Sequence, residues 1–236
     1  MKNLSIIIPC FNEEGNIDNL FNSVEKLIEK NKNLEIIIVE NGSTDQSLKK
    51  IQEQDLYKKK LIKLVIIDEN KGYGFGIMQG VYSASGRYIS WCHADMQTTP
   101  QDVVNAFLYN FEKLEEQKLV IKGKRINRNY FDQIFTLGMS VLASLIFGKK
   151  LSDINAQPKI FPKEFINHMR YPPNDFSLDV YFLVTAIQNN YKIIEHTVNW
   201  NQRTSGEAKG GGSLKLKLNL TIQTLKCIIK IKKNIF

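Results

Sequence analysis

Short apolar runs alternate with amphipathic stretches along the first half of the chain. The runs at 6–8 and 36–39 are continuously apolar, as expected for strands that are covered on both faces. Between them, apolar residues in 16–31 recur three or four positions apart, which predicts a helix. Strands that alternate with helices through short links form a parallel sheet covered by helices. We therefore expect an α/β fold.

The remaining elements follow from the same periodicities. Strands are expected at 4–9, 34–39, 61–67, 87–91, 120–123 and 191–200. Helices are expected at 16–31, 43–54, 74–84, 100–116, 130–147 and 176–189. A glycine-rich loop follows at 203–212, and we expect a basic amphipathic helix at 213–236. Residues 1–212 are expected to form one domain, with a regular half at 1–125 and a less regular half at 126–212.

Composition narrows the class of protein. A chain of 236 residues with 43% hydrophobic content can bury one substantial core. No apolar stretch reaches the roughly 18 residues needed to cross a bilayer, and the first apolar run is too short for a signal peptide. The three cysteines are far apart and lack metal-site spacing, which indicates reduced thiols in the cytoplasm.

The net charge of +8 is concentrated at the end of the sequence. Residues 209–236 contain seven lysines and no acidic residue, so residues 1–208 carry only about +1. Such a segment is typical of binding to nucleic acid or to an anionic membrane surface, or of a solubilising tail. Aromatic residues are not interleaved with these lysines, and we therefore do not expect a nucleic-acid partner.

Polar side chains follow three of the predicted strands, at the edge where ligands bind in parallel sheets. After the fourth strand, His93, Asp95 and Gln97 occupy alternate positions, so on an extended segment they point the same way. A carboxylate, an amide and an imidazole suit a divalent cation that also carries a phosphate and water. A solvated strand end would have the same pattern.

Four segments occur in the order IPCFNEE at 8–14, VENGSTD at 39–45, NKGYG at 70–74 and ADMQ at 94–97. In this order they resemble the family-2 inverting glycosyltransferases of GT-A fold, and among these the polyprenyl-phosphate branch of the dolichol-phosphate mannose synthase kind. Weaker matches at 153–161 and 203–209 extend the resemblance to about residue 212. The resemblance implies a mostly parallel central sheet flanked by helices, with a Rossmann-like nucleotide-sugar half and an acceptor half.

The resemblance implies contacts to the nucleotide from the first two strand ends. Pro9 and Phe11 would form an apolar wall for a base or ribose, and Glu13 would accept hydrogen bonds from ribose hydroxyls. Glu40 would accept from a base N–H. Gly42 permits a tight turn in any case, and the serine after it is expected to cap the next helix.

Further nucleotide-sugar contacts are expected from Lys71, Gly72, Ala94 and Asp95. The backbone N–H groups of the glycine-rich segment 70–76 would meet a base or a phosphate. Glycine clusters also occur in ordinary loops.

By the same resemblance, Asp95 and Gln97 would ligate Mg²⁺ or Mn²⁺ on the donor diphosphate. His93 stands where the family has its first carboxylate. It ligates the metal, only hydrogen-bonds the donor, or marks weaker metal dependence. Imidazole suits Mn²⁺ better than Mg²⁺ and supplies no negative charge.

On the acceptor side, Asn155 and Gln157 would donate to and accept from hydroxyls, and Asp179 would lie near the acceptor. A phosphate acceptor is already ionised, whereas a sugar hydroxyl needs a general base, so Asp179 separates the two acceptor classes. Arg203 and Lys209 would bind the donor diphosphate or the acceptor phosphate. We expect catalysis to depend on Asp95, Asp179 and Arg203.

The implied reaction is metal-assisted transfer of a sugar from a nucleotide sugar to polyprenyl phosphate with inversion. The protein would be peripheral at the inner face of the cell membrane, bound to the membrane surface or to a membrane protein. The helix at 130–147 and the basic tail would lie in the bilayer interface, or else be one core helix and one surface helix. The alternatives are transfer to a saccharide hydroxyl in cell-surface polysaccharide assembly, with Asp179 as base, and a non-catalytic nucleotide-sugar-binding subunit.

Overall fold

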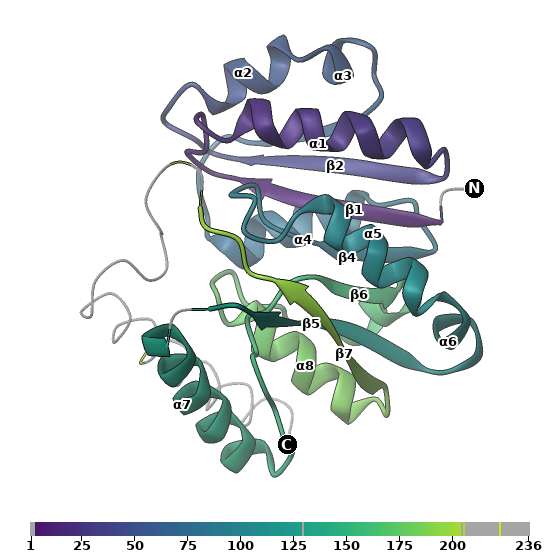
Figure 1. Cartoon of the computed structure of the whole chain (residues 1–236), viewed down its shortest axis with the longest axis vertical. Helices are drawn as coiled ribbons and strands as arrows, with labels where there is room; N and C mark the ends of the chain where they lie inside the picture. The colour runs from purple at the N-terminus through teal and green to yellow at the C-terminus, as the bar shows by residue number, and fades with distance from the viewer. Residues whose placement is uncertain (1–2, 129, 204, 206–221, 223–236) are drawn as a thin grey trace.

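A seven-stranded sheet forms the centre of the computed structural model, which describes residues 3–128, 130–203, 205 and 222 (Figure 1). The strand order is β3-β2-β1-β4-β6-β5-β7. The strands are β1 (Leu4–Cys10), β2 (Leu34–Asn41), β3 (Lys63–Ile67), β4 (Tyr88–Trp91), β5 (Leu119–Ile126), β6 (Lys159–Pro162) and β7 (Lys192–Asn199). Neighbouring strands are parallel except where β6 pairs with β4 and β5. The expected mostly parallel sheet is confirmed.

Helices cover both faces of this sheet. They are α1 (Ile17–Lys30), α2 (Ser47–Glu53), α3 (Asp55–Lys58), α4 (Tyr73–Ser83), α5 (Pro100–Tyr109), α6 (Phe111–Glu116), α7 (Tyr130–Phe147), the 3₁₀ helix η1 (Lys163–His168) and α8 (Leu178–Gln188). Ile6 and Ile8 pack in one core with α1 and α5, whereas Ile7 packs in the other with α4 and α8. Successive strand side chains point to opposite faces. The continuously apolar runs therefore fill two cores at once.

Two predicted helices have different bounds in the structure. The helix expected at 43–54 begins only at Ser47, whose amide donates to Asp45 Oδ1 at 2.8 Å. The expected cap from Ser43 is wrong, because its Oγ accepts the amide of Asn12 at 3.0 Å instead. The helix expected at 100–116 ends and restarts at Asn110, whose side-chain amide donates to the Ala106 carbonyl at 2.9 Å. Such side-chain bonds compete with helix continuation.

The second half contains two elements that the periodicity did not predict. Strand β6 and helix η1 follow each other over 159–168, a region for which no element was expected. Strand β5 extends three residues beyond the expected end at 123, because its later residues pair with β7. The long-range pairing therefore defines this half of the sheet.

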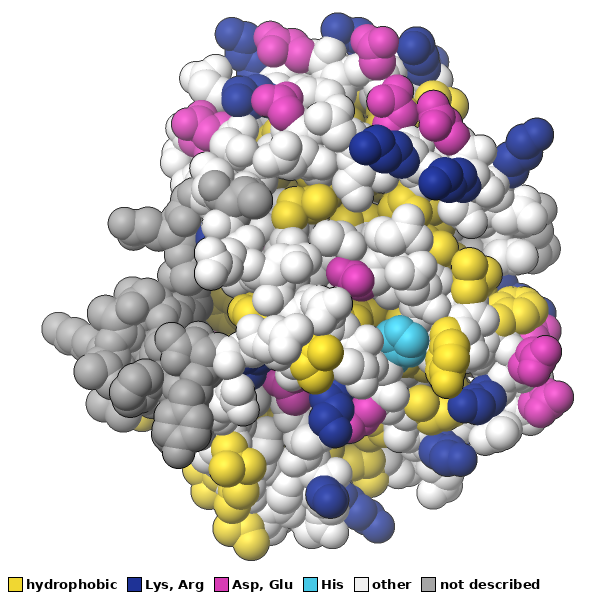
Figure 2. Space-filling view, viewed as in Figure 1, with side chains coloured by type: hydrophobic (Ala, Val, Ile, Leu, Met, Phe, Trp, Pro, Cys, Tyr) yellow, Lys and Arg dark blue, Asp and Glu magenta, His cyan; other side chains and the backbone are white. Residues whose placement is uncertain are grey.

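Helix α7 lies at the edge of the molecule beside β5, away from α1 and α2 (Figure 1). Ser140 and Ala143 are buried, whereas Leu137, Val141 and Leu145 are 64%, 50% and 75% exposed. Figure 2 shows hydrophobic side chains gathered at the lower left, where Figure 1 places α7. Within the described residues, no helix combines the length and apolarity needed to span a membrane. The expected basic helix at 213–236 lies outside the described residues, apart from position 222.

Candidate active site

Two carboxylates and a guanidinium meet at the carboxyl ends of β1 and β4, which are parallel neighbours. Arg203, in the segment that follows β7, lies 3.5 Å through Nη1 from Asp95 Oδ2 and forms a close ion pair through Nη2 with Glu13. The three side chains are only 10–14% exposed. The structure thus brings together three residues that the sequence assigned to the diphosphate and the nucleoside.

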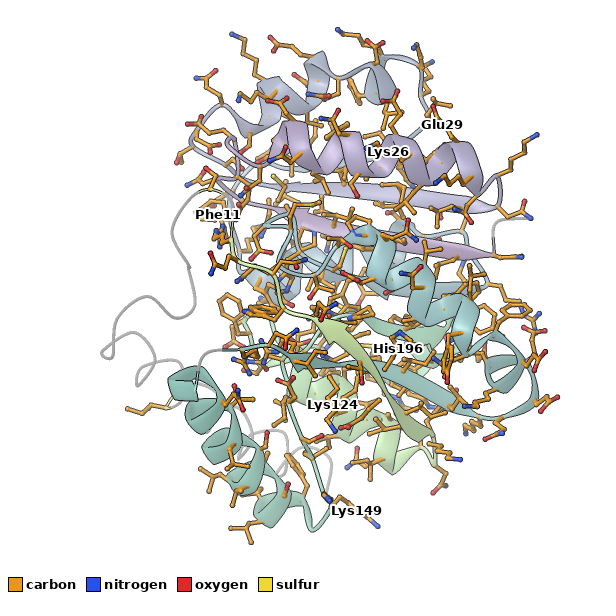
Figure 3. The ribbon with its side chains drawn as sticks, in the orientation of Figure 1. Phe11, Lys26, Glu29, Lys124, Lys149 and His196 are labelled. Atoms are coloured by element: carbon orange, nitrogen blue, oxygen red, sulfur yellow. The ribbon has the colours of Figure 1, made fainter. Side chains whose placement is uncertain are left out.

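The segment around Arg203 is packed on the loop between β1 and α1. Ser205 O accepts from Arg203 Nε at 2.8 Å and from Asn16 Nδ2 at 3.3 Å. A Cβ atom at Gly15 would overlap the Ser205 side chain, which would then have to move. Figure 3 labels Phe11 at the same end of β1.

The loop after β1 is held by side chains of the loop after β2 and of the first residue of α2. The amide of Glu13 donates to Ser47 Oγ at 2.8 Å, and the amide of Glu14 donates to Asp45 Oδ2 at 3.2 Å. These bonds fix the backbone from which Glu13 reaches Arg203. Pro9 and Phe11 are half-buried at this strand end, and their contact with a base or ribose stays a prediction.

Glu40 caps its own turn. It is 2% exposed, and its oxygens accept the amides of Ser43 at 2.7 Å and Gly42 at 3.2 Å. Gly42 has φ +72°, and a Cβ there would collide with the backbone of residues 69–70. The turn therefore places the 70s loop beside β2. A contact between Glu40 and a base stays a prediction, and would require the carboxylate to share these amides.

The glycine-rich segment 70–76 packs against residues far away in the sequence. The amides of Gly74 and Phe75 donate to Asn174 O at 2.7 and 3.1 Å, so these two amides are already paired within the protein. Contact of this segment with a base or a phosphate stays a prediction. A Cβ at Gly72 or Gly74 would overlap the backbone of 173–175. Lys71 is exposed, with Nζ 5.4 Å from the centre of the Phe75 ring, and its ligand contact stays a prediction.

The donor set at 93–97 fits a divalent cation held jointly with a diphosphate. Asp95 Oδ1 accepts the amide of Gln97 at 3.1 Å, while Asp95 Oδ2 already faces the guanidinium of Arg203. The Gln97 side-chain amide donates to Asn201 O at 3.4 Å. Within the described residues, no three His, Cys, Asp or Glu side chains converge to hold a metal unaided. One carboxylate with phosphate and water ligands is a usual Mg²⁺ arrangement.

A second, buried cluster connects His93 of the 93–97 segment with residues of the second half of the chain. Tyr73 Oη lies 3.0 Å from His93 Nε2, 3.1 Å from Gln157 Nε2 and 3.3 Å from Asp179 Oδ2. Gln157 Nε2 also donates to Asp179 Oδ1 at 3.1 Å, and Lys159 Nζ lies 3.0 Å from the same oxygen. Asp179 is 2% exposed and Lys159 is fully buried. Asp179 is therefore not an exposed helix acid.

Burial sets the protonation behaviour of this cluster. Desolvation, followed by the charge of Asp179, raises the pKa of Tyr73 well above its usual value, so the hydroxyl keeps its proton. Desolvation lowers the pKa of Lys159 to about 8, although the neighbouring Asp179 carboxylate opposes this shift. The sequence assigned no role to Tyr73 or Lys159. The one feature of the sequence that could have indicated a buried ion pair is the lysine directly before the apolar residues Ile160 and Phe161.

Basic residues at the end of β5 form a third group that the sequence analysis missed. Arg125 makes a bidentate pair with Asp153, and Arg128 Nη1 lies 3.6 Å from Asp153 Oδ1. Both guanidinium groups lie over the Trp200 ring, at 4.7 and 5.7 Å from its centre. Asn155 is half-buried nearby in sequence, and its acceptor role stays a prediction. The predicted phosphate ligand Lys209 lies outside the described residues.

Three similar proteins are named as sugar transferases or synthases of polyprenyl phosphates. Dolichyl-phosphate beta-glucosyltransferase of Dictyostelium discoideum is 25% identical over 97% of this chain and 73% of its own length. Dolichol-phosphate mannosyltransferase of Pyrococcus furiosus is 25% identical over 87% of this chain and 58% of its own length. Dodecaprenyl-phosphate galacturonate synthase of Rhizobium johnstonii is 24% identical over 97% of this chain and 68% of its own length.

Solved structures confirm the expected GT-A architecture. Glucosyl-3-phosphoglycerate synthase from Mycobacterium tuberculosis, in complex with Mn²⁺, UDP-glucose and phosphoglyceric acid, matches with a TM-score of 0.75 at 13% identity. The match covers 98% of this chain and 80% of that one. The same enzyme with Mg²⁺ and UDP matches with a TM-score of 0.73.

A comparison of the sequence with models of protein families identifies the family. The model of Glycosyl transferase family 2 matches residues 5–169, which include all four motifs and the strands that carry them. The chain belongs to Glycosyl transferase family 2 and is a glycosyltransferase.

Proposed function

We propose that this glycosyltransferase moves a sugar from a nucleotide sugar to polyprenyl phosphate, with inversion at the anomeric carbon and with Mn²⁺ or Mg²⁺. The names of three relatives, each a sugar transferase acting with dolichyl or dodecaprenyl phosphate, support this acceptor class. The Mn²⁺ and Mg²⁺ complexes of the structural neighbour support the choice of metals.

The proposal of a phosphate acceptor rests mainly on the burial of Asp179 and on the donors that surround its carboxylate. Its two oxygens face the ammonium of Lys159, the amide of Gln157 and the hydroxyl of Tyr73, and the side chain is buried. A carboxylate held by three donors is poorly placed to take a proton from a sugar hydroxyl. A phosphate acceptor needs no such base, because its oxygen is already an anion.

The donor side has groups suited to the departure of a nucleoside diphosphate. A phosphate oxygen of the acceptor attacks the anomeric carbon from the face opposite the leaving group, and the bond to the diphosphate breaks. Arg203 lies between Glu13 and Asp95, ready to exchange one carboxylate for the diphosphate as negative charge grows there. A divalent ion bound with Asp95, Gln97 and His93 would add positive charge at the same place.

Helix α7 is the element through which we propose that the protein meets the membrane. Leu137, Val141 and Leu145 form one exposed apolar stripe at four-residue spacing, and Lys149 follows the helix end (Figure 3). An apolar stripe with basic neighbours suits a helix that lies in the interface of an anionic bilayer. Arg128 donates to Thr136 Oγ1 at 2.9 Å, which ties the start of α7 to the basic group at the end of β5. The lipid phosphate would enter from this side.

Transfer assays test the proposal. The protein is incubated with a panel of radiolabelled nucleotide sugars in Mn²⁺, Mg²⁺ or EDTA, with polyprenyl phosphate or with saccharide acceptors. We expect a lipid-linked product of inverted anomeric configuration, formed with a metal and not with EDTA. Transfer only to a saccharide would contradict the lipid acceptor. Nucleotide-sugar binding with no turnover on any acceptor would indicate a non-catalytic subunit.

A further inference from the structure

The hydrogen positions in the buried cluster around Tyr73 follow from its donor and acceptor atoms. Lys159 is the first residue whose protons can be assigned. Its Nζ lies 2.9 Å from Ile154 O, 2.6 Å from Ala156 O and 3.0 Å from Asp179 Oδ1. All three partners are oxygens that accept. An ammonium has three protons to donate, whereas a neutral amine has two. The surroundings of Lys159 therefore match the charged form, and they stabilise Asp179 as a carboxylate.

The ionised Asp179 then orients its other neighbours. Gln157 must present its NH₂ group to Asp179 Oδ1, because the flipped amide would place two oxygens 3.1 Å apart. The same NH₂ group lies 3.1 Å from Tyr73 Oη and donates to it. Asp179 Oδ2, 3.3 Å from Tyr73 Oη, can only accept. The single proton of Tyr73 therefore points to Asp179.

With its proton used, Tyr73 can only accept from its third neighbour, His93. The distance between Tyr73 Oη and His93 Nε2 is 3.0 Å, a normal hydrogen bond. His93 therefore carries its proton on Nε2, and Nδ1 keeps the lone pair. In the opposite tautomer, Tyr73 would donate to His93, and two lone pairs would face each other between Tyr73 and Asp179. The rings of Tyr73 and His93 also meet edge to face, with centres 5.5 Å apart.

We propose that Asp179 is a positioning residue, which acts through Tyr73 to hold His93 in the Nε2–H tautomer, so that His93 Nδ1 ligates the metal bound with the donor diphosphate. The ligation step rests on the proposed function, whereas the tautomer does not. This assigns Asp179 a part in donor binding instead of proton removal from the acceptor. It also accounts for an imidazole at a position where the motif has a carboxylate, since a neutral ring ligates only through the nitrogen that lacks a proton.

Nitrogen NMR reads the tautomer without any ligand. The chain has three histidines, so ¹⁵N-histidine labelling gives three ring systems, and His168→Gln and His196→Gln variants assign them. At about pH 7.5 we expect the proton of His93 on Nε2. Tyr73→Phe should reduce this preference toward a mixture, and Asp179→Asn should reverse it. Tyr82→Phe, an exposed tyrosine on the same helix, should leave it unchanged. A wild-type His93 protonated on Nδ1, or unaffected by Tyr73→Phe, would overturn the proposal.

Pulsed EPR of Mn²⁺ tests the ligation. The ion is added with whichever of the uridine, guanosine, adenosine, cytidine and thymidine diphosphates binds most tightly. We expect a directly coordinated nitrogen in the wild-type protein, lost in His93→Gln and retained in His168→Gln. Mn²⁺ and nucleotide binding without that nitrogen would overturn the inference and leave the proposed function standing. Failure to bind Mn²⁺ with any nucleotide would overturn both. The Tyr73→Phe variant keeps the Lys159–Asp179 ion pair. If Asp179→Asn fails to fold, the Tyr73→Phe variant alone still tests the proposed tautomer.

Discussion

The donor cluster and the buried cluster both pair carboxylates with cations, but in different surroundings. In the donor cluster, Arg203 lies between Glu13 and Asp95, and their side chains are 10–14% exposed at the open edge of the sheet. In the buried cluster, Lys159 and Asp179 are 0% and 2% exposed and are enclosed by the core. Electrostatic contacts at the open edge can be exchanged for those of a ligand. Those in the core are fixed, because separating a buried pair leaves an uncompensated charge.

This difference matches two separate roles in the reaction that we propose. The donor cluster would release and rebind partners in each cycle, with Arg203 exchanging a carboxylate for the diphosphate. The buried cluster would keep Tyr73 and His93 in one arrangement throughout. Substitutions in the first cluster should therefore affect transfer, and substitutions in the second should affect stability as well.

Removing the buried cation should have the largest effect. Lys159→Met leaves Asp179 charged and unpaired, and we expect the free energy of unfolding to fall by about 3–5 kcal/mol. The double variant Lys159→Met/Asp179→Asn should recover at least half of this loss. Urea denaturation measures both, with the exposed Lys26→Met as the control (Figure 3). Equal stability of wild type and Lys159→Met would contradict a fixed buried pair.

Removing the donor carboxylate should instead affect the reaction. Asp95→Ala is expected to lower kcat/KM by about 100-fold or more, since it removes charge that orients the metal and diphosphate. Its free energy of unfolding should change by about 1 kcal/mol or less, because Arg203 keeps its pair with Glu13. Glu29→Ala, at the far end of α1, is the matched control (Figure 3). Unchanged transfer by Asp95→Ala would refute the donor-site assignment.

Membrane binding should depend on neither cluster. We expect the triple variant Leu137→Gln/Val141→Gln/Leu145→Gln to bind anionic lipid vesicles at least about tenfold more weakly, because three apolar side chains no longer insert. Transfer to a short-chain, water-soluble polyprenyl phosphate should stay at the wild-type level. Leu108→Gln, an equally exposed leucine on α5, should bind vesicles normally. If both variants lose binding to the same extent, α7 is not the membrane face.

A further expected effect is a dependence of stability on pH that comes from Lys159 alone. Burial lowers the pKa of Lys159 to about 8 in the folded protein, against an ordinary lysine value of 10.5. Between these values the unfolded chain binds more protons, so this group makes the free energy of unfolding rise with pH. The slope is at most about 1.4 kcal/mol per pH unit. It should appear as the difference between wild type and Lys159→Met in urea denaturation from pH 7 to 10, and parallel curves would contradict it.

The structure of the donor cluster could be predicted from the sequence more completely than that of the buried cluster. The donor strands and their polar ends followed from continuous apolar runs and from short motifs, since each residue there acts close to its own strand. Asp95 and Glu13 were placed correctly at one sheet edge for this reason. Glu40 was not foreseen as a cap for its own turn, because a motif comparison matches residue types and does not show which backbone amides a side chain reaches.

The buried cluster depends on contacts between distant parts of the chain. Strand β6 is antiparallel and four residues long, and its pairing with β4 joins residues about seventy positions apart. The glycines at 72 and 74 are explained by the backbone of residues 173–175, a hundred positions away, which no local pattern reveals. The contacts of Lys159 and Tyr73 with Asp179 could be recognised only after these pairings had brought the three residues together.

In the reaction that we propose, the acceptor oxygen is already an anion, so that no base is required. The most direct measurement compares polyprenyl phosphate with the polyprenol of the same chain length, in one reaction with the same nucleotide sugar and Mn²⁺. We predict that sugar is transferred to the lipid phosphate and not to the lipid alcohol. Glycosylation of the alcohol at a comparable rate would contradict the claim and would require a general base in this site.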